Sequence, residues 1–226
     1  MQKFSLLILC AGFGKRMLDL TANKPKPLLK IENSSILENT INFFQNIGCN
    51  KIFINTHYLH KKIENYILKK YKNNRINLVY EPSILGTGGG IKNIFNYVNN
   101  ENICVVNSDI FWRQHNKLDI LNFLKDFNNV KNCKILLVKE NNFFGLKNKK
   151  GDFNIKYNIV SNWNSGDEVI YYSGLQIVSK KIFRNMPLNF SINEVWQKLI
   201  LNKSLKGEII GSDILHVGDK NTFRQL

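Results

Sequence analysis

A turn that contains two glycines and two cations follows the first apolar run of the chain. Gly12 and Gly14 let the backbone turn tightly and expose its amide hydrogens to an anion, and Lys15 and Arg16 add positive charge at the same place. The same pattern also fits an ordinary strand-to-helix turn. A dinucleotide-binding fingerprint is disfavoured, because Met17 stands where its third glycine would be. The turn therefore predicts a site for phosphate groups.

A third cation lies between two prolines further along the chain. Pro25 and Pro27 fix the backbone on either side of Lys26 and so limit the directions in which its ammonium group points. By itself this tripeptide is more typical of a surface turn. Together with the glycine-containing turn, it predicts fixed amides and several cations near the carboxyl end of one strand, which is where open α/β sheets bind ligands.

Two more segments are expected at the same edge. Segment 81–91 contains four glycines, which would let the backbone approach a flat ligand closely, although a flexible turn is the alternative. Asp109 follows the predicted central strand 103–107, where its carboxylate could hold Mg²⁺ against phosphates. The alternative for Asp109 is a helix cap.

These residues depend on strands and helices that alternate along the chain. Short apolar runs rich in β-branched residues alternate with longer segments whose apolar residues recur at three- and four-residue spacing. This alternation is typical of βαβ units and predicts an α/β fold with a Rossmann-like, doubly wound and mostly parallel sheet. The predicted strands are 4–11, 51–55, 78–80, 103–107 and 135–138, and the predicted helices are 36–47, 59–70, 90–98 and 118–127.

The pattern changes after about residue 141. Segments 153–159 and 169–178 have the composition of strands around a polar stretch, and predict a small antiparallel addition beside the main sheet. The remaining predicted elements are helices at 180–184 and 192–201 and a strand at 205–210.

Length and composition favour a single domain over residues 1–226. Of these residues 43% are apolar, which is enough for one buried core. No stretch reaches the ~18 apolar residues that span a bilayer, and the apolar start ends at Gly12. The four cysteines are far apart and lie in or beside apolar runs, which favours buried thiols in a reducing compartment. We therefore expect a cytoplasmic protein without a membrane partner.

The net charge of +15, from 32 basic and 17 acidic residues, raises the question of nucleic-acid binding. The lysines are scattered and lack the aromatic interleaving of a nucleic-acid-binding surface. We expect a solvated basic surface that draws in anionic substrates, and no nucleic-acid partner.

The order of these motifs resembles the sugar-1-phosphate nucleotidyltransferase family. The similarity covers nearly the whole chain, from the turn at 9–17 and Pro-Lys-Pro at 25–27 to the glycine run at 85–90 and Asn-Ser-Asp at 107–109. Segments 172–178 and 216–223 resemble its sugar-side strand and its closing turn. The resemblance implies the nucleotide-diphospho-sugar transferase fold. Among short members, the chain looks most like N-acetylmuramate 1-phosphate uridylyltransferase, with mannose and heptose 1-phosphate guanylyltransferases close to it.

The resemblance implies roles for the residues at matching positions. The nucleotide would be bound by Ala11, Gly12, Gly14, Lys15, Arg16, Leu85, Gly86, Thr87 and Gly88. Arg16, Lys26 and Asp109 would be catalytic, and Gly174 would lie beside the sugar. Mg²⁺, or else Mn²⁺, would be held by Asp109 and by His216, which stands where the family has a second aspartate. An ordinary hydrogen-bonded histidine is the alternative for His216, and Asp213 and Asp219 are the nearest carboxylates that could take the place of the second aspartate.

The implied reaction joins a nucleoside triphosphate, with UTP favoured, to a sugar 1-phosphate and releases pyrophosphate and a nucleotide sugar. Such a product would serve cell-wall or surface-glycan synthesis, as in peptidoglycan recycling. The sugar phosphate needs no general base, because the second pKa of a phosphate monoester is about 6. A GTP-dependent mannose or heptose 1-phosphate guanylyltransferase and a non-catalytic nucleotide-sugar-binding protein of the same fold are the alternatives. The expected partners are the two substrates, and the expected assembly is a monomer or a small homo-oligomer.

Overall fold

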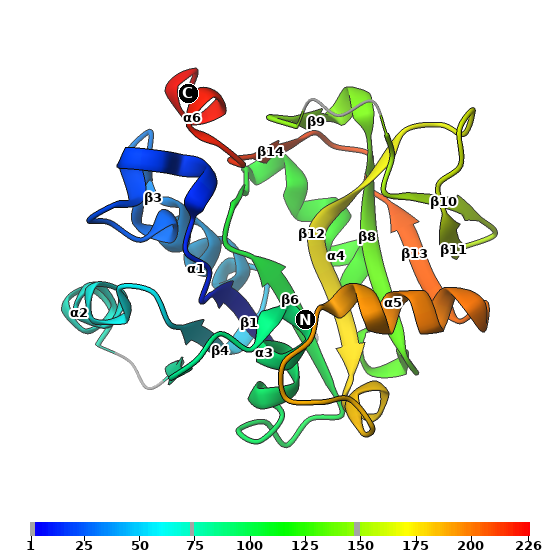
Figure 1. Ribbon diagram of the computed structural model, residues 1–226, viewed down its shortest axis with the longest axis horizontal. Helices are drawn as coiled ribbons and strands as arrows, with labels where there is room; N and C mark the ends of the chain where they lie inside the picture. Colours follow the sequence, from blue (N-terminus) through cyan, green and yellow to red (C-terminus); the bar gives the residue numbers. More distant parts are fainter. Residues whose placement is uncertain (1–2, 73–74, 147–149) are drawn as a thin grey trace.

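A nine-stranded sheet runs through the centre of the molecule (Figure 1). The computed structural model describes residues 3–72, 75–146 and 150–226. The strands of this sheet are β1 Phe4–Cys10, β4 Cys49–Thr56, β5 Ile76–Tyr80, β6 Asn102–Asn107, β8 Cys133–Lys139, β10 Phe153–Lys156, β11 Ile159–Asn162, β12 Ile170–Ser179 and β13 Leu205–Ile209. Across the sheet they lie in the order β10-β11-β13-β8-β12-β6-β1-β4-β5.

Strands β6, β1, β4 and β5 form the parallel part of the sheet that the sequence predicts. At the centre of β1, Leu7 lies opposite Phe53 on one side and Val105 on the other. These three side chains are at most 1% exposed. Strands that are buried on both faces require the nearly continuous apolar runs seen in the sequence. Because the carboxyl ends of parallel strands meet at one edge, the turn after β1 lies beside the segment after β6.

Strand β12 joins the parallel part to an antiparallel region, which confirms the predicted addition. It pairs antiparallel with both β6 and β8. The prediction of a single strand at 153–159 is wrong, because β10 and β11 form a hairpin over these residues and the next few. Its turn consists of Tyr157 and Asn158, which both have positive φ. A two-residue turn of this kind matches the twist of the strands and does not require glycine at either position, although glycine is the usual signal.

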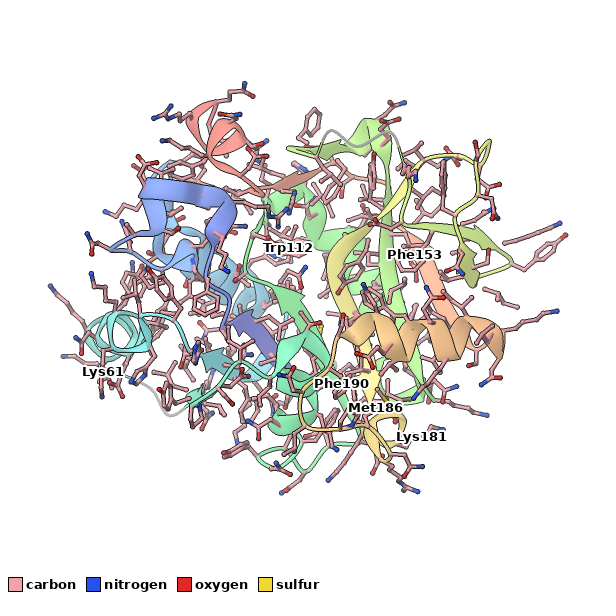
Figure 2. All side chains as sticks on the ribbon, in the orientation of Figure 1. Lys61, Trp112, Phe153, Lys181, Met186 and Phe190 are labelled. Carbon is pink, nitrogen blue, oxygen red and sulfur yellow. The ribbon has the colours of Figure 1, made fainter. Side chains whose placement is uncertain are left out.

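Helices cover both faces of the sheet, as predicted for a doubly wound fold (Figure 1). Helices α1 (Ile36–Asn46), α2 (His60–Lys70) and α4 (Lys117–Leu124) pack on one face, in a core cluster that includes Trp112 (Figure 2). Helices α3 (Gly86–Ile94) and α5 (Ile192–Leu201) pack on the other, in a cluster that includes Phe190. None of the helices in the described ranges combines the length and the apolar character needed to cross a membrane.

Two helices differ from the sequence-based expectation. Helix α3 begins inside the glycine run rather than at residue 90, because packing against the segment before α5 outweighs the low helix propensity of glycine. Segment 180–184 forms a short 3-10 helix, Lys180–Phe183, instead of an α-helix.

A three-stranded sheet holds the last part of the chain against the edge where β1 and β6 end. Strand β14 (Ile214–His216) lies between β7 (Ile110–Phe111) and β9 (Phe143–Phe144). The pairing of His216 with Ile110 brings this strand next to Asp109. The remaining elements are β2 Lys30–Ile31, β3 Ser34–Ser35, α6 Lys220–Arg224 and 3-10 helices at Lys15–Thr21, Lys26–Leu28, Gln114–Asn116, Phe127–Asn129 and Glu140–Asn142.

Candidate active site

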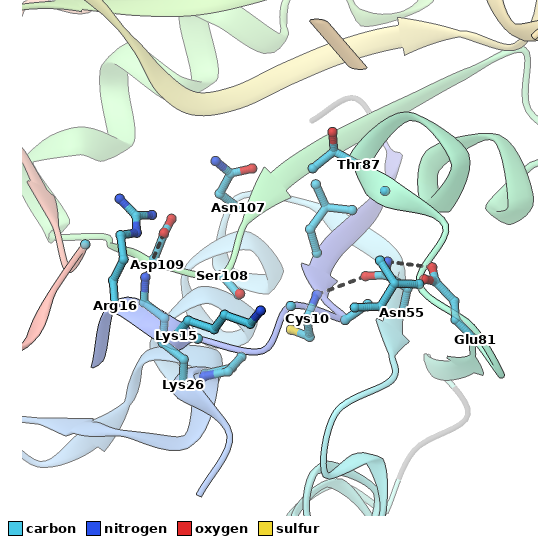
Figure 3. Close-up of a pocket in the computed structure, with 18 residues that line it drawn as sticks. Cys10, Lys15, Arg16, Lys26, Asn55, Glu81, Thr87, Asn107, Ser108 and Asp109 are labelled. Atoms are coloured by element: carbon cyan, nitrogen blue, oxygen red, sulfur yellow. Dashed lines mark hydrogen bonds and ion pairs between the residues drawn. The ribbon is translucent and has the colours of Figure 1, made fainter. Parts of the chain in front are cut away.

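A cavity of about 430 Å³ lies at the edge where β1 and β6 end (Figure 3). Its lining includes nine residues that the sequence analysis assigned to the site, namely Ala11, Gly12, Gly14, Lys15, Arg16, Lys26, Gly86, Thr87 and Asp109. Four other assigned residues do not line it, namely Leu85, Gly88, Gly174 and His216. The structure therefore brings the predicted phosphate, lysine and carboxylate positions together in one place.

The turn after β1 forms one wall of this cavity. Gly14 has a φ of 67°, in the left-handed region that favours glycine. A Cβ at this position would lie 3.2 Å from Lys26 Cβ, so glycine also lets the turn approach Lys26 closely. The carbonyl of Gly14 accepts a hydrogen bond from Thr21 Oγ1 at 3.1 Å. At Gly12, by contrast, an added Cβ would meet only open space. The turn thus places its own cations and Lys26 along the same wall.

Lys26, Asp109 and His216 form a charged cluster at this wall. Lys26 Nζ lies 2.9 Å from Asp109 Oδ2, and His216 Nε2 lies 3.4 Å from the same oxygen. Burial raises the pKa of Asp109, but the hydrogen bond from His216 and the positive charge of Lys26 outweigh it and hold that pKa well below its ordinary value. Asp109 is therefore an anion at neutral pH.

Asp109 keeps one oxygen for a further partner. Its Oδ1 is buried, and no described residue forms a hydrogen bond with it. A buried carboxylate oxygen without a partner is unfavourable, and carboxylate oxygen is the ligand type that Mg²⁺ prefers. The cluster therefore fits a divalent cation. Within the described ranges no group of three His, Cys, Asp or Glu side chains could hold such an ion, so substrate and water would have to complete its shell.

His216 is placed mainly by packing. Its ring stacks on Phe143, with ring centroids 5.4 Å apart and an angle of 27° between the planes. Gly218 leaves room for the ring, since a Cβ there would lie 2.5 Å from His216 Cε1. The Nδ1 atom is buried and has no hydrogen-bond partner among the described residues. His216 therefore adjoins the cavity through its contact with Asp109.

The opposite wall carries a buried polar pair that the sequence analysis did not identify (Figure 3). Asn55 Oδ1 accepts a hydrogen bond from the backbone N–H of Cys10 at 2.9 Å, and Asn55 Nδ2 donates to Glu81 Oε1 at 2.8 Å. Burial raises the pKa of Glu81, and the hydrogen bond from Asn55 opposes this rise. A Cβ at Gly90 would lie 2.8 Å from Asn55 Nδ2, so this glycine makes room for the pair.

Two glycines of the run 86–90 serve the packing of the chain rather than the cavity. The N–H groups of Gly88 and Gly89 both donate to the carbonyl of Phe190, at 3.1 and 3.2 Å. A Cβ at Gly88 would lie 2.2 Å from Cε2 of the Phe190 ring. Thr87 lines the cavity, but its hydroxyl also accepts a hydrogen bond from the N–H of Ile192 at 3.0 Å. The sequence predicts that this run approaches a ligand closely. At Gly88 and Gly89 the structure shows instead a close approach to the segment before α5.

Replacing Gly88 by alanine is expected to destabilise the fold, because the added methyl group overlaps the Phe190 ring. Overpacking of this kind costs about 1–3 kcal/mol, which urea unfolding monitored by circular dichroism would measure. Gly12→Ala is the matched control, with a change below about 0.5 kcal/mol, since its Cβ meets no neighbour. Equal stability of the two variants would contradict the packing role of Gly88.

Gly174 lies at an irregularity of β12. The register between β12 and β8 shifts between Tyr172 and Gln176. Gly174 has a φ of 91°, and a Cβ there would lie 2.7 Å from Ile110 Cγ1. Backbone conformation and the close approach of β7 both require glycine at this position. The position of Gly174 beside the sugar stays a prediction.

Comparison with known proteins gives a family match for the chain. The Nucleotidyl transferase family matches residues 5–156, which is more than half of the chain. D-glycero-alpha-D-manno-heptose 1-phosphate guanylyltransferase of Aneurinibacillus thermoaerophilus is 26% identical over 97% of this chain and 95% of its own length. N-acetylmuramate alpha-1-phosphate uridylyltransferase of Caulobacter vibrioides is 23% identical over 94% of this chain and 91% of its own.

The fold is also that of a solved structure. HddC from Yersinia pseudotuberculosis, complexed with GMP-PN, superimposes with a TM-score of 0.76 at 23% identity, covering 98% of this chain and 97% of HddC. The family match and the relatives that align with nearly the whole chain together decide the class of the protein. The chain belongs to the nucleotidyl transferase family and is a sugar-1-phosphate nucleotidyltransferase.

Proposed function

We propose that the protein transfers a guanylyl group from GTP to a sugar 1-phosphate, with residues 1–226 acting as one domain. The observation that carries the choice of GTP is the buried carboxylate of Glu81 in the cavity lining. A heptose 1-phosphate is the first candidate for the sugar, because a heptose 1-phosphate guanylyltransferase aligns with nearly the whole chain.

The chemistry of Glu81 favours guanine over uracil. A carboxylate accepts hydrogen bonds and donates none. Oε1 of Glu81 already accepts one from Asn55, and Oε2 accepts one from the backbone N–H of Leu85 at 3.5 Å, but each oxygen can accept a second hydrogen bond. The Watson–Crick edge of guanine offers two neighbouring donors, N1–H and N2–H. Uracil offers one donor between two carbonyl oxygens. A carboxylate would repel both of these oxygens. Asn55 holds Glu81 in the acceptor role, since its own Oδ1 is bound to the N–H of Cys10 and its Nδ2 points to Glu81.

UTP is the second candidate nucleotide. The sequence resemblance favours it, and a uridylyltransferase also aligns with most of the chain. A uridylyltransferase would require Glu81 to be protonated or to turn away from the base, and its hydrogen bond to Asn55 opposes such a turn.

In the proposed reaction, an oxygen of the sugar 1-phosphate attacks the α-phosphorus of the triphosphate. A new oxygen–phosphorus bond forms as the bond to the pyrophosphate oxygen breaks, and the electron pair leaves with pyrophosphate. The barrier lies in bringing two anions together, so the residues must neutralise charge and align the groups. Lys26 and Arg16 line the cavity and supply that charge, while Gly12 and Gly14 offer backbone amides.

Asp109 and His216 would hold a divalent cation that supplies further positive charge to the phosphates. The unpartnered Oδ1 of Asp109 is the support for this placement. His216 lies 3.4 Å from the other carboxylate oxygen. A carboxylate suits Mg²⁺, and an imidazole suits Mn²⁺ better than Mg²⁺.

The experiment that tests the proposed function is a pyrophosphate-release assay. It crosses GTP, UTP, ATP and CTP with the 1-phosphates of heptose, mannose, N-acetylmuramic acid and glucosamine, each with Mg²⁺ and with Mn²⁺. GTP is expected to give the highest kcat/KM with at least one sugar. Preference for UTP with every accepted sugar would replace the proposal by its second candidate, and no release with any pair would reject both.

Replacing Glu81 by glutamine is expected to reverse the choice of base. Glutamine can accept from Asn55 with its oxygen and present its NH₂ group to the base, where guanine offers only donors. The ratio of kcat/KM for GTP to kcat/KM for UTP should fall about 100-fold, in the range expected when a buried group is left unpaired. Because burial raises the pKa of Glu81, acidification should weaken GTP binding more in the wild type than in the variant.

The control is Glu101→Gln, which changes an exposed glutamate outside the cavity. It should leave both kcat/KM values unchanged. An unaltered ratio in Glu81→Gln would show that the base is read elsewhere.

The product of this reaction is an activated sugar, and we propose that it supplies cell-wall or surface-glycan assembly. The four cysteines are free and buried, which supports the proposed cytoplasmic location.

A further inference from the structure

Phe13 holds the phosphate loop, residues 12–23, from outside the cavity. Its ring contacts the ring of His57, with centroids 5.7 Å apart, and the ring of Tyr58, with centroids 5.6 Å apart. Both partners directly follow β4. The Phe13 side chain is 42% exposed and does not belong to the main core clusters. The ring therefore anchors the loop to a neighbouring strand end, and not to the core.

The same strand end holds the other end of the phosphate loop. The hydroxyl of Tyr58 lies 2.9 Å from the carbonyl oxygens of both Thr21 and Ala22, to which it donates. Lys62 Nζ donates to the carbonyl of Asn23. Contacts at both ends restrict a loop whose glycines would otherwise leave it many conformations.

His57 connects this arrangement to the base side of the cavity. Its Nδ1 donates to the carbonyl of Glu81, with 2.7 Å between the two atoms. The side chain of Glu81 belongs to the opposite wall. Two consecutive residues thus contact both the phosphate loop and Glu81.

We propose that Phe13, His57 and Tyr58 form an aromatic clasp that positions the phosphate loop for the triphosphate. None of the three lines the cavity, so they are positioning residues that act through the backbone of Gly12 and Gly14. Phe13 also orients a cation, because Lys15 Nζ lies 5.4 Å from the centre of its ring. The inference rests on the proposed function only in taking the loop as the triphosphate site.

A clasp of this kind acts before the chemical step. It orders the loop in advance and so reduces the conformational entropy lost when phosphates bind. Its removal should therefore weaken binding of any triphosphate, whatever its base, and leave the rate from the bound state nearly unchanged.

The test is Phe13→Ala, with binding of GTP, UTP and inorganic tripolyphosphate measured by calorimetry. The dissociation constants of all three should rise about tenfold, while kcat at saturating substrate changes less than about twofold. Phe13→Tyr keeps the ring and should bind like the wild type. Phe144→Ala removes another exposed ring that does not line the cavity, and should change neither quantity.

Tyr58→Phe is the second variant, because it removes one hydroxyl and keeps the ring contact. It should raise the same dissociation constants about fivefold, and its effect should be smaller in the Phe13→Ala background, since both changes release one loop. Should Phe13→Ala fold poorly, Tyr58→Phe alone decides the matter.

Wild-type affinity for tripolyphosphate in both variants would overturn the clasp, and so would a loss confined to kcat. Wild-type protein that binds none of the three probes would reject the proposed function itself. The two failures are therefore distinguishable.

Discussion

Replacing Asp109 by asparagine is expected to lower kcat about a thousandfold. The amide keeps the shape of the side chain but loses the negative charge that holds a hard cation and that pairs with Lys26, whose Nζ lies 2.9 Å away. Raising Mg²⁺ should rescue the variant poorly. Steady-state pyrophosphate release, measured over a range of Mg²⁺ and Mn²⁺ concentrations, checks both statements.

The matched control for this change is Asp213→Asn. Asp213 is a half-buried carboxylate that pairs with His115 and does not line the cavity. Its replacement should leave kcat and the metal dependence unchanged. Full activity of Asp109→Asn would remove Asp109 from the mechanism, and the unpartnered Oδ1 would then need another explanation.

Replacing Lys26 by alanine is expected to lower kcat about 100-fold while the KM for the triphosphate rises much less. The positive charge matters most when negative charge gathers on the reacting phosphates, so its loss acts mainly on the transition state. The variant should also be less stable, because Asp109 stays buried without its cationic partner. Steady-state kinetics and a thermal unfolding curve measure the two effects separately.

Lys24→Ala is the control for this variant, since Lys24 is exposed and lies two positions away on the same loop. It should retain wild-type kinetics. A Lys26→Ala variant that keeps its kcat and only raises the KM would show that Lys26 serves binding alone.

Local sequence patterns determined the parallel part of the fold and the turn after β1. Strands β1, β4 and β6 are buried on both faces over most of their length, so their apolar runs stand out against the amphipathic helices between them, whereas β5 is a partly exposed edge strand. Gly14 was predictable for a similar reason, because its left-handed conformation is a property of one residue. The lysine between two prolines and the carboxylate after β6 followed from the rule that ligands bind where parallel strands end.

Contacts between distant segments could not be derived in this way. Asn55 and Glu81 end or follow predicted strands, which was a signal, but only the tertiary structure shows that the two side chains bond across the edge of the sheet. Asn107 and Ser108 line the cavity beside Asp109. In the sequence, only their place in the family motif indicates that they belong to the site. His216 reaches Asp109 because β14 pairs with β7, which no local pattern of the chain indicates.

Glycine shows most clearly what the sequence determines and what the structure decides. A run of glycines predicts that another group approaches the backbone closely, but it does not predict which group. In segment 86–90 the approaching groups are the carbonyl and ring of Phe190, the carbonyl of Leu188 and the Asn55–Glu81 pair. The aromatic clasp has the same origin, since the pairing of β1 with β4 brings Phe13 next to His57 and Tyr58. Conformational preference is encoded residue by residue, whereas the identity of a neighbour depends on how the whole chain packs.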